Sequence, residues 1–245
     1  MIDIIPFLQF GFFVPHGITA QPETIVKLTN EFKDWNLLPS TVQSLQLNNI
    51  QPLSTVMQLQ LISPKRDLII DFEPIRYNIK FNAVPEKPVP AIEEFSLKVS
   101  KIINLLNRIT PYKANRLSFV TRCFCKKMSI KEIDSVNSKI FNLPTLFKDN
   151  IPVEWSTRQI IRKEIAFNGK KELINIILDI NKVQLLTLEG IKNIPEDRIE
   201  LGFDINTYQL NQSQRFDSDD VTPFISSAEK IMKEIEQDIQ KVIYG

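Results

Sequence analysis

Two long stretches with apolar residues at helical spacing constrain this chain more than any other feature of its sequence. Apolar side chains recur every three or four residues over 90–109 and again over 221–242, which predicts two helices that each bury one face. Residues 218–220 (Ser-Asp-Asp) precede the second stretch, and their side chains supply N-capping oxygens and negative charge for the start of a helix. Such helices need an apolar surface of matching length to cover.

Alternating apolar and polar residues predict strands in most of the remaining sequence. The clearest cases are 76–83 and 199–206, where every second side chain is apolar. The other expected strands are residues 4–14, 41–47, 56–62, 67–72, 117–125, 153–167, 173–180 and 183–188. Shorter helices are expected after Pro22 and after Ser129, where an acid three residues later completes a capping box. The dipeptide 168–169 (Asn-Gly) predicts a hairpin turn.

The order of these elements repeats along the chain. Residues 1–112 are expected to form a strand, a helix, four antiparallel strands and a long helix, and residues 113–245 are expected to repeat that order. The predicted fold class is therefore α+β, with two similar halves and with helices packed on one face of a sheet whose other face is free. This order resembles tandem repeats of the TATA-box-binding-protein-like fold, a likeness of topology that implies no function.

Two stretches also resemble a protein family. The first is 59–66 (Leu-Gln-Leu-Ile-Ser-Pro-Lys-Arg), which leads through a strand to the 90–109 helix and then to 115–119 (Asn-Arg-Leu-Ser-Phe). The second is 203–206 (Phe-Asp-Ile-Asn), followed by the acid-capped terminal helix. The chain is similar in these features to a sporadically distributed family of uncharacterised prokaryotic proteins of about this length. The resemblance implies a setting in defence or mobile-element loci, and it carries over no catalytic residues.

Composition is typical of a folded protein in a reducing compartment, with 43% apolar and 24% charged residues. Asp3 and the absence of an early basic cluster argue against a secretory signal. The longest apolar run, near 7–14, is interrupted by Gln9 and is shorter than the roughly 18 residues of a membrane-spanning segment. Two cysteines do not make a disulfide framework. We therefore expect a cytoplasmic protein without a membrane partner.

Charge is unevenly distributed although the net charge is only +1. Residues 113–182 carry a net charge of +7 and residues 183–245 a net charge of −6. This pattern has two interpretations. The basic block can form a surface for an anionic partner, or the two segments can neutralise each other within the fold.

Residues with catalytic or metal-binding chemistry are scarce. His16 is the only histidine, and it stands in a turn with no motif around it. Cys123 and Cys125 point to the same side of a strand, but no second cysteine pair exists for a tetrahedral zinc site, so buried thiols are expected. Asp71 and Glu73 share a strand face, where charges that protect a sheet edge are commoner than a catalytic pair. The sequence predicts no enzyme, no cofactor and no metal.

The free sheet face is the better candidate for function, because amides are abundant on it and can hydrogen-bond a peptide, a subunit or nucleic-acid edges. The residues predicted to form this face are Gln58, Gln60, Arg76, Asn78, Lys80, Asn206 and Tyr208, with Gln46, Asn82, Asn175, Asp179 and Asp204 beside them. A second candidate is a basic cluster around the predicted 168–169 turn that could contact phosphate. It consists of Arg158, Arg162, Lys163, Lys170 and Lys171. The simpler interpretations are a solvated sheet face and a solvated hairpin tip.

Three functions follow from these observations. The first is a non-enzymatic interaction protein, an adaptor or specificity subunit that binds another protein subunit or a second copy of itself. The second is nucleic-acid binding by the sheet face and the basic 158–171 hairpin, which would be salt-dependent. The third is a small-ligand pocket between the sheet and a long helix, as in helix-grip folds.

Overall fold

A computed structural model describes residues 2–46, 54–141, 145, 152–189 and 192–244. In chain order, the elements are β1 (Ile2–Phe13), α1 (Pro22–Glu31), η1 (Lys33–Trp35), β2 (Leu38–Gln46), β3 (Ser54–Ile62), β4 (Leu68–Glu73), β5 (Arg76–Asn82), α2 (Ile92–Ile109), β6 (Arg116–Cys125), α3 (Ile130–Ile140), β7 (Ser156–Phe167), β8 (Lys170–Glu189), β9 (Lys192–Thr207) and α5 (Ser218–Tyr244).

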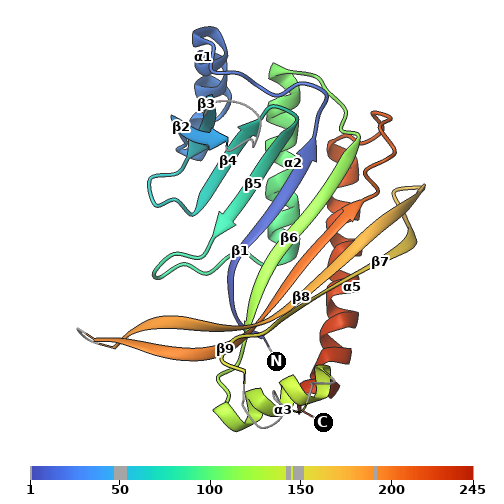
Figure 1. The fold of residues 1–245 in the computed structure, drawn as a ribbon. Coiled ribbons are helices and arrows are strands. Elements are labelled where there is room, and N and C mark those ends of the chain that lie inside the picture. The colour runs from blue at the N-terminus through green and yellow to red at the C-terminus, as the bar shows by residue number, and fades with distance from the viewer. Residues whose placement is uncertain (1, 47–53, 142–144, 146–151, 190–191, 245) are drawn as a thin grey trace.

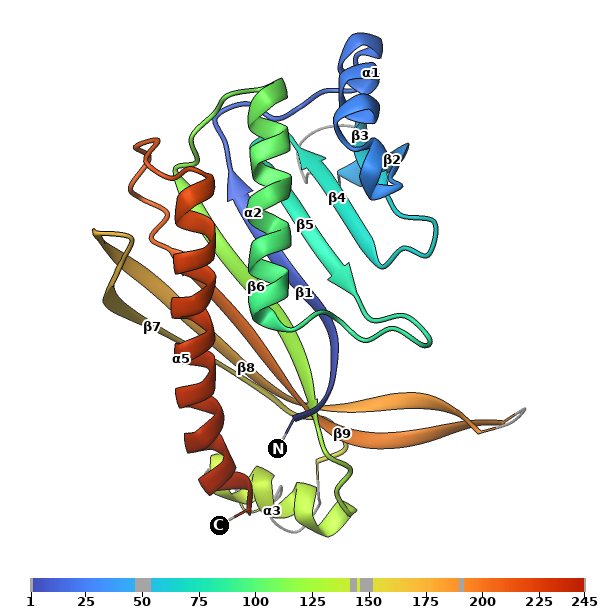
Figure 2. The same ribbon diagram turned by 180° about the vertical axis from the view of Figure 1, so that it is seen from behind.

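The strands form one antiparallel sheet in the order β2-β3-β4-β5-β1-β6-β9-β8-β7. The first strands of the two predicted halves, β1 and β6, pair with each other at its centre. Outward from β1 lie β5, β4, β3 and β2, and outward from β6 lie β9, β8 and β7, so each half runs outward in reverse chain order. Helices α2 and α5 lie side by side on one face, and no helix of the described residues lies on the opposite face (Figure 2). The α+β class with helices packed on a sheet is confirmed.

The first half follows the predicted order, but the described part of the second half has three strands after its first helix instead of four. The segments expected as separate strands at 173–180 and 183–188 are both part of β8. The expected boundary between them fell at residues 181–182 (Asn-Lys). Instead, both residues stay in register with β9, and Asn181 donates a hydrogen bond to Glu200 at 3.0 Å. Beyond the sheet, β8 and β9 continue as a two-stranded arm (Figure 1).

The core lies between the sheet and the two long helices. Phe95 of α2 packs its ring 5.5 Å from Phe81 and 6.0 Å from Phe119, while Phe224 of α5 lies 6.4 Å from Phe10, all measured between ring centroids. Burial of such aromatic side chains supplies much of the stabilisation of a core. Fully buried side chains fill the space between the sheet and the two long helices. This packing argues against the small-ligand pocket of the helix-grip kind that the sequence left open.

The structure contains the predicted capping box and hairpin turn, and the cap of α5 lies one residue earlier than expected. Ser129 and Glu132 form the predicted capping box of α3. Asn168 and Gly169 both adopt positive φ, at 48° and 72°, as a two-residue hairpin turn requires. At α5, however, the cap is Asp217, whose carboxylate accepts from the backbone N–H of Asp219 at 3.1 Å.

Candidate interaction surface on the open sheet face

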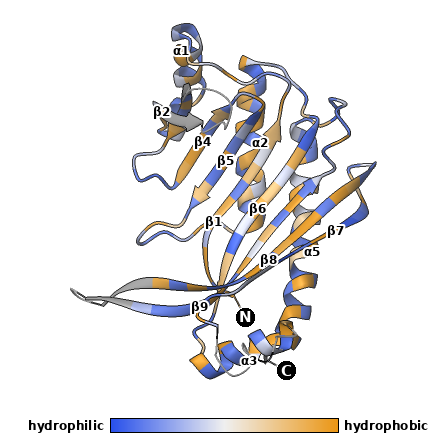
Figure 3. Cartoon of the chain, viewed as in Figure 1, coloured by the Kyte–Doolittle hydropathy of each residue, from blue (hydrophilic) through white to orange (hydrophobic). Residues whose placement is uncertain are grey.

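Polar residues cross the open face of the sheet, opposite α2 and α5, in a single row from β3 to β7. Cross-strand register aligns the following residues: Gln60, Asp71, Asn78, Gly11, Ser118, Asn206, Asn175 and Arg162. Figure 3 shows hydrophilic segments interspersed among hydrophobic ones along the strands of the sheet. Side chains in a strand point alternately to the two faces, so this row and every second residue from it belong to the open face.

All residues predicted for this face lie on it wherever the structure describes their side chains. Gln58, Arg76, Lys80 and Tyr208 are two residues from members of the row, and Asn82, Asn175, Asp179 and Asp204 share the face by the same spacing. The side chain of Gln46 lies outside the described part of the chain.

Hydrogen bonds orient the amides of the row. Arg162 Nε donates to Asn175 Oδ1 at 3.2 Å, Asn175 Nδ2 to Asn206 Oδ1 at 3.0 Å, and Asn206 Nδ2 to Asp204 Oδ1 at 2.8 Å. Asn206 is only 1% exposed, so the middle of this series of hydrogen bonds lies beneath the surface of the open face. Each bond restricts the rotamers of its two side chains, so Arg162 and Asn175, which remain at the surface, present donors and acceptors in fixed orientations.

On the other side of the sheet centre, the open face contains an incompletely bonded amide. Asn78 donates to Glu73 Oε1 at 2.5 Å, and Gln60 donates to Asp71. The amide oxygen of Asn78 is buried and has no hydrogen-bond partner among the described residues. A buried acceptor without a partner costs free energy.

The centre of the face depends on a glycine. A Cβ atom on Gly11 would overlap the hydroxyl of Ser118 on the neighbouring strand. The absence of a side chain at Gly11 therefore leaves room for the Ser118 hydroxyl against the backbone of β1 at the middle of the polar row.

Three aromatic rings on the open face carry cations. Lys80 lies 4.4 Å from the centroid of Phe7, and Arg162 lies 4.7 Å from that of Tyr208. Phe13 lies between two guanidinium groups, Arg76 at 5.2 Å and Arg116 at 4.7 Å. Cation–π contacts of this kind hold the cations over the rings.

Arg116 lacks a carboxylate within ion-pair distance among the described residues. Its Nε is buried without a hydrogen-bond partner in the described structure, and burial lowers the pKa of the guanidinium, with Arg76 adding to the effect and Asp204 opposing it. The side chain lines a pocket of about 270 Å³ together with Asn115, Gln209 and Gln212. An anionic group of a partner would fit the charge of this pocket.

Acids pair with three of the other bases on this face. Arg76 pairs with Glu73 at 2.7 Å, Arg122 with Glu200 at 3.4 Å and Arg158 with Asp179 at 3.1 Å. Burial, and secondarily the charge of Glu73, raise the pKa of Asp71 despite its hydrogen bond from Gln60. The open face is therefore mixed in charge rather than basic.

The predicted basic cluster is not a single patch. Arg158 and Arg162 are on the open face, but Lys163 lies on the helix-covered face, 3.9 Å from Glu234 of α5. Lys170 also points to the helix side and pairs with Asp220 at 2.5 Å. The residues separate because neighbours in a strand project to opposite faces. Lys171 is exposed and, four residues before Asn175 in β8, lies on the open face.

Ion pairs in the structure also bear on the two interpretations of the uneven charge distribution along the chain. Lys113, Lys163 and Lys170 of the basic block pair with acids of the acidic segment, and the side chain of Asp220 is 0% exposed. The structure therefore supports mutual neutralisation within the fold.

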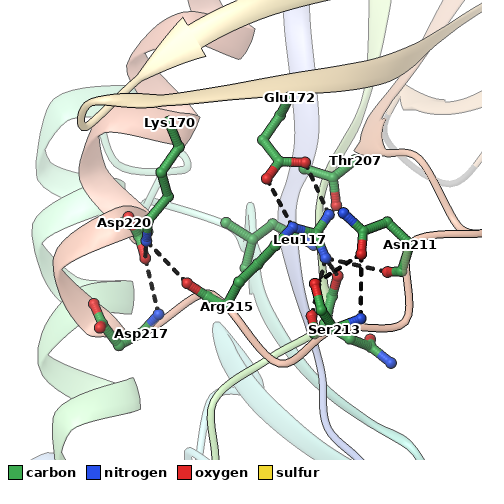
Figure 4. Close-up of polar contacts among 10 residues, drawn as sticks. Leu117, Lys170, Glu172, Thr207, Asn211, Ser213, Arg215, Asp217 and Asp220 are labelled. Atoms are coloured by element: carbon green, nitrogen blue, oxygen red, sulfur yellow. Dashed lines mark hydrogen bonds and ion pairs between the residues drawn. The ribbon is translucent and has the colours of Figure 1, made fainter.

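A second polar cluster, which sequence patterns did not indicate, surrounds Arg215 (Figure 4). Arg215 donates to both carboxylate oxygens of Glu172, at 2.7 and 2.8 Å, and its Nη1 donates to the backbone carbonyls of Asn115, Asn211 and Ser213. These bonds occupy the guanidinium and tie the 208–217 segment to β6 and β8. Its function is structural, and no local sequence signal could reveal contacts across 43 and 100 residues.

The candidates for chemistry remain separate. His16 is exposed, with its ring 6.3 Å from that of Tyr112. Cys123 and Cys125 are buried free thiols, and burial raises their pKa to about 12 and about 11. Within the described residues, no group of three or more His, Cys, Asp or Glu side chains is arranged to hold a metal ion, and no helix there could cross a membrane.

Fold and surface together define an α+β protein with an open antiparallel sheet face. No protein-family model matches the chain, and no curated protein matches it significantly in sequence.

Proposed function

We propose that this chain is a non-enzymatic interaction protein that binds another protein through the open face of its sheet. The observation that carries the proposal is the polar row across eight strands, whose amides are oriented by hydrogen bonds and left uncovered by helices. The face carries aromatic rings and arginines, and both residue types are enriched at protein interfaces.

Charge favours a protein over a nucleic acid as the partner. Nucleic-acid binding draws most of its affinity from bases that neutralise phosphates. Here Arg76, Arg122 and Arg158 already have acid partners, and Asp71 and Asp204 would repel a phosphate backbone. A protein partner can satisfy both signs of charge.

Site-specific photocrosslinking in the native host tests this proposal. A photoreactive residue at Tyr208, on the open face, is expected to give one defined protein adduct. The matched control is the same residue at Leu97, which is exposed on α2 behind the sheet. Adducts that are absent, or identical from both positions, would refute binding by the open face.

Nucleic-acid binding is the second candidate, and the cation-bearing rings of Phe7, Phe13 and Tyr208 favour it, because aromatic and basic side chains bind single strands together. Its test is salt-dependent binding to single-stranded DNA and RNA. Replacement of Arg76 and Arg116 by alanine should weaken binding, whereas Lys163→Ala on the helix side should not. No binding at low salt would remove this candidate.

The biological setting is a further part of the proposal. We infer an adaptor or specificity subunit in the cytoplasm of a prokaryote, in a defence or mobile-element system, from the family resemblance of 59–66, 115–119 and 203–206. The TATA-box-binding-protein-like comparison belongs to the same proposal, and the central pairing of the two leading strands is consistent with it. The genes flanking this one test the setting.

A further inference from the structure

Strand β7 forms one edge of the sheet, and it is long, regular and free of proline. It is 12 residues long, and its pairing with β8 continues without a bulge from Ser156 to Phe167. Ile160 and Ile161, at its middle, are each 58% exposed and lie on opposite faces. A long, regular edge with exposed apolar side chains presents its backbone N–H and C=O groups to another strand.

The opposite edge differs. Strand β2 carries Pro39, which cannot donate a backbone hydrogen bond. Proline thus blunts β2, whereas β7 contains no proline along its length.

The sequence of β7 is complementary to itself in one antiparallel register. When Ile161 is placed opposite Ile161 of a second copy, Arg158 faces Glu164 of that copy, and the reverse pair forms by symmetry. Shifting the pairing by two residues places Arg158 opposite Arg162, or Arg162 opposite itself. Opposite charges across strands stabilise pairing and like charges oppose it, so charge selects the first register.

We propose that β7 is a homodimerisation edge, at which two copies pair antiparallel about Ile161. Residues that face each other in this register have the same strand parity, so the sheet continues through both copies with the two open faces on one side. The occupant is a second copy because the charge pattern of β7 matches its own reverse. This inference is independent of the partner that the open face binds.

The first experiment measures mass and register together. Light scattering of the wild-type chain should give twice 28.4 kDa. Under mild oxidation, Ile161→Cys should form a disulfide-linked dimer, because the Cα atoms of directly opposed residues in antiparallel strands lie about 4.5–5.5 Å apart. Native Cys123 and Cys125 are buried and should not interfere.

The matched control is Lys163→Cys, which lies on the same face of the same strand and is also exposed. In the proposed register the two copies of this residue are four positions out of alignment, about 13 Å apart, so no crosslink is expected. Crosslinking through residue 163 but not 161 would overturn the register.

The second experiment tests charge. Glu164→Arg should raise the dimer dissociation constant by about tenfold, because two attractive contacts become repulsive. A second variant, Arg158→Glu with Asp179→Asn, should be weakened likewise while avoiding repulsion within the chain. Mixed together, the two variants should form a heterodimer, because each cation then faces an anion.

Three results would overturn the proposal. They are a monomeric wild-type chain at all concentrations, a dimer that Glu164→Arg leaves unchanged, and a mixture that does not form heterodimers. A strand from a different protein on β7 would show itself by the first of these results.

Discussion

The buried carboxylate of Asp220 offers the sharpest test of how this fold is held together. Its side chain is 0% exposed and accepts hydrogen bonds from Lys170 Nζ at 2.5 Å, Asn168 Nδ2 at 2.7 Å and the backbone N–H of Asp217 at 3.0 Å. These contacts join the β7–β8 turn to the start of α5. Asp220→Asn preserves the shape of the side chain and removes its charge.

The expected loss of unfolding free energy is about 3 kcal/mol. Removing one partner of a buried ion pair costs about 3–5 kcal/mol. The lower end applies because the Lys170 side chain is 33% exposed and keeps its bond to the carbonyl of Arg215 at 2.9 Å. In a chain of this length such a loss corresponds to a decrease of about 6–12 °C in Tm.

The effect also has a defined pH dependence. Burial alone would raise the pKa of Asp220, but hydrogen bonds from Lys170 and Asn168 outweigh it and lower the pKa below its ordinary value. In the unfolded chain an aspartate titrates near about 3.9. The stability that Asp220 contributes is therefore complete above that pH and is lost as the pH falls through the lower pKa of the folded state.

Urea unfolding of wild type and variant at pH 7, 5, 4 and 3 measures both quantities. The difference in unfolding free energy should be constant between pH 7 and 5 and should decrease below about pH 4. Asp219→Asn is the control, because Asp219 is exposed in the same helical turn. The reasoning fails when Asp220→Asn costs no more than the control, or when its cost does not change with pH.

Three further perturbations have defined outcomes. Gly11→Ala should destabilise the fold by about 1–3 kcal/mol through overlap with the Ser118 hydroxyl; adding Ser118→Ala should recover part of the loss in thermal unfolding, and no recovery would place the strain elsewhere. Phe224→Ala should cost about 3–5 kcal/mol by opening a cavity in the core, whereas Val242→Ala, 41% exposed on the same helix, should cost less than about 0.5 kcal/mol; equal losses would contradict the assigned core face. The two buried thiols should not react with a thiol reagent at pH 8 in the native state, since burial raises their pKa to about 12 and about 11, and both should react in denaturant; rapid native reaction would show that the strand opens.

Local pattern was sufficient for most elements. Helices α2 and α5 and strands β5 and β9 follow from the spacing of apolar residues, because a side chain's face depends on position within its own element. The same rule placed Arg76, Asn78 and Asn206 on one face before their strands were known to be in one sheet. Alternation failed at Asn181 and Lys182, because cross-strand bonds to β9 kept polar residues in a strand that local preference would have ended.

The sequence by itself determined most of the helices and strands and which side chains share a face, because both depend on spacing along the chain. Only the tertiary structure decided that Lys170 is bound by Asp220, that Glu172 holds Arg215 and that β7 is left at an edge. Those outcomes depend on strand order and on contacts between residues 43 and 50 positions apart. Nearby residues cannot encode them, because charges that are separated in sequence become partners only after the sheet and α5 have packed together.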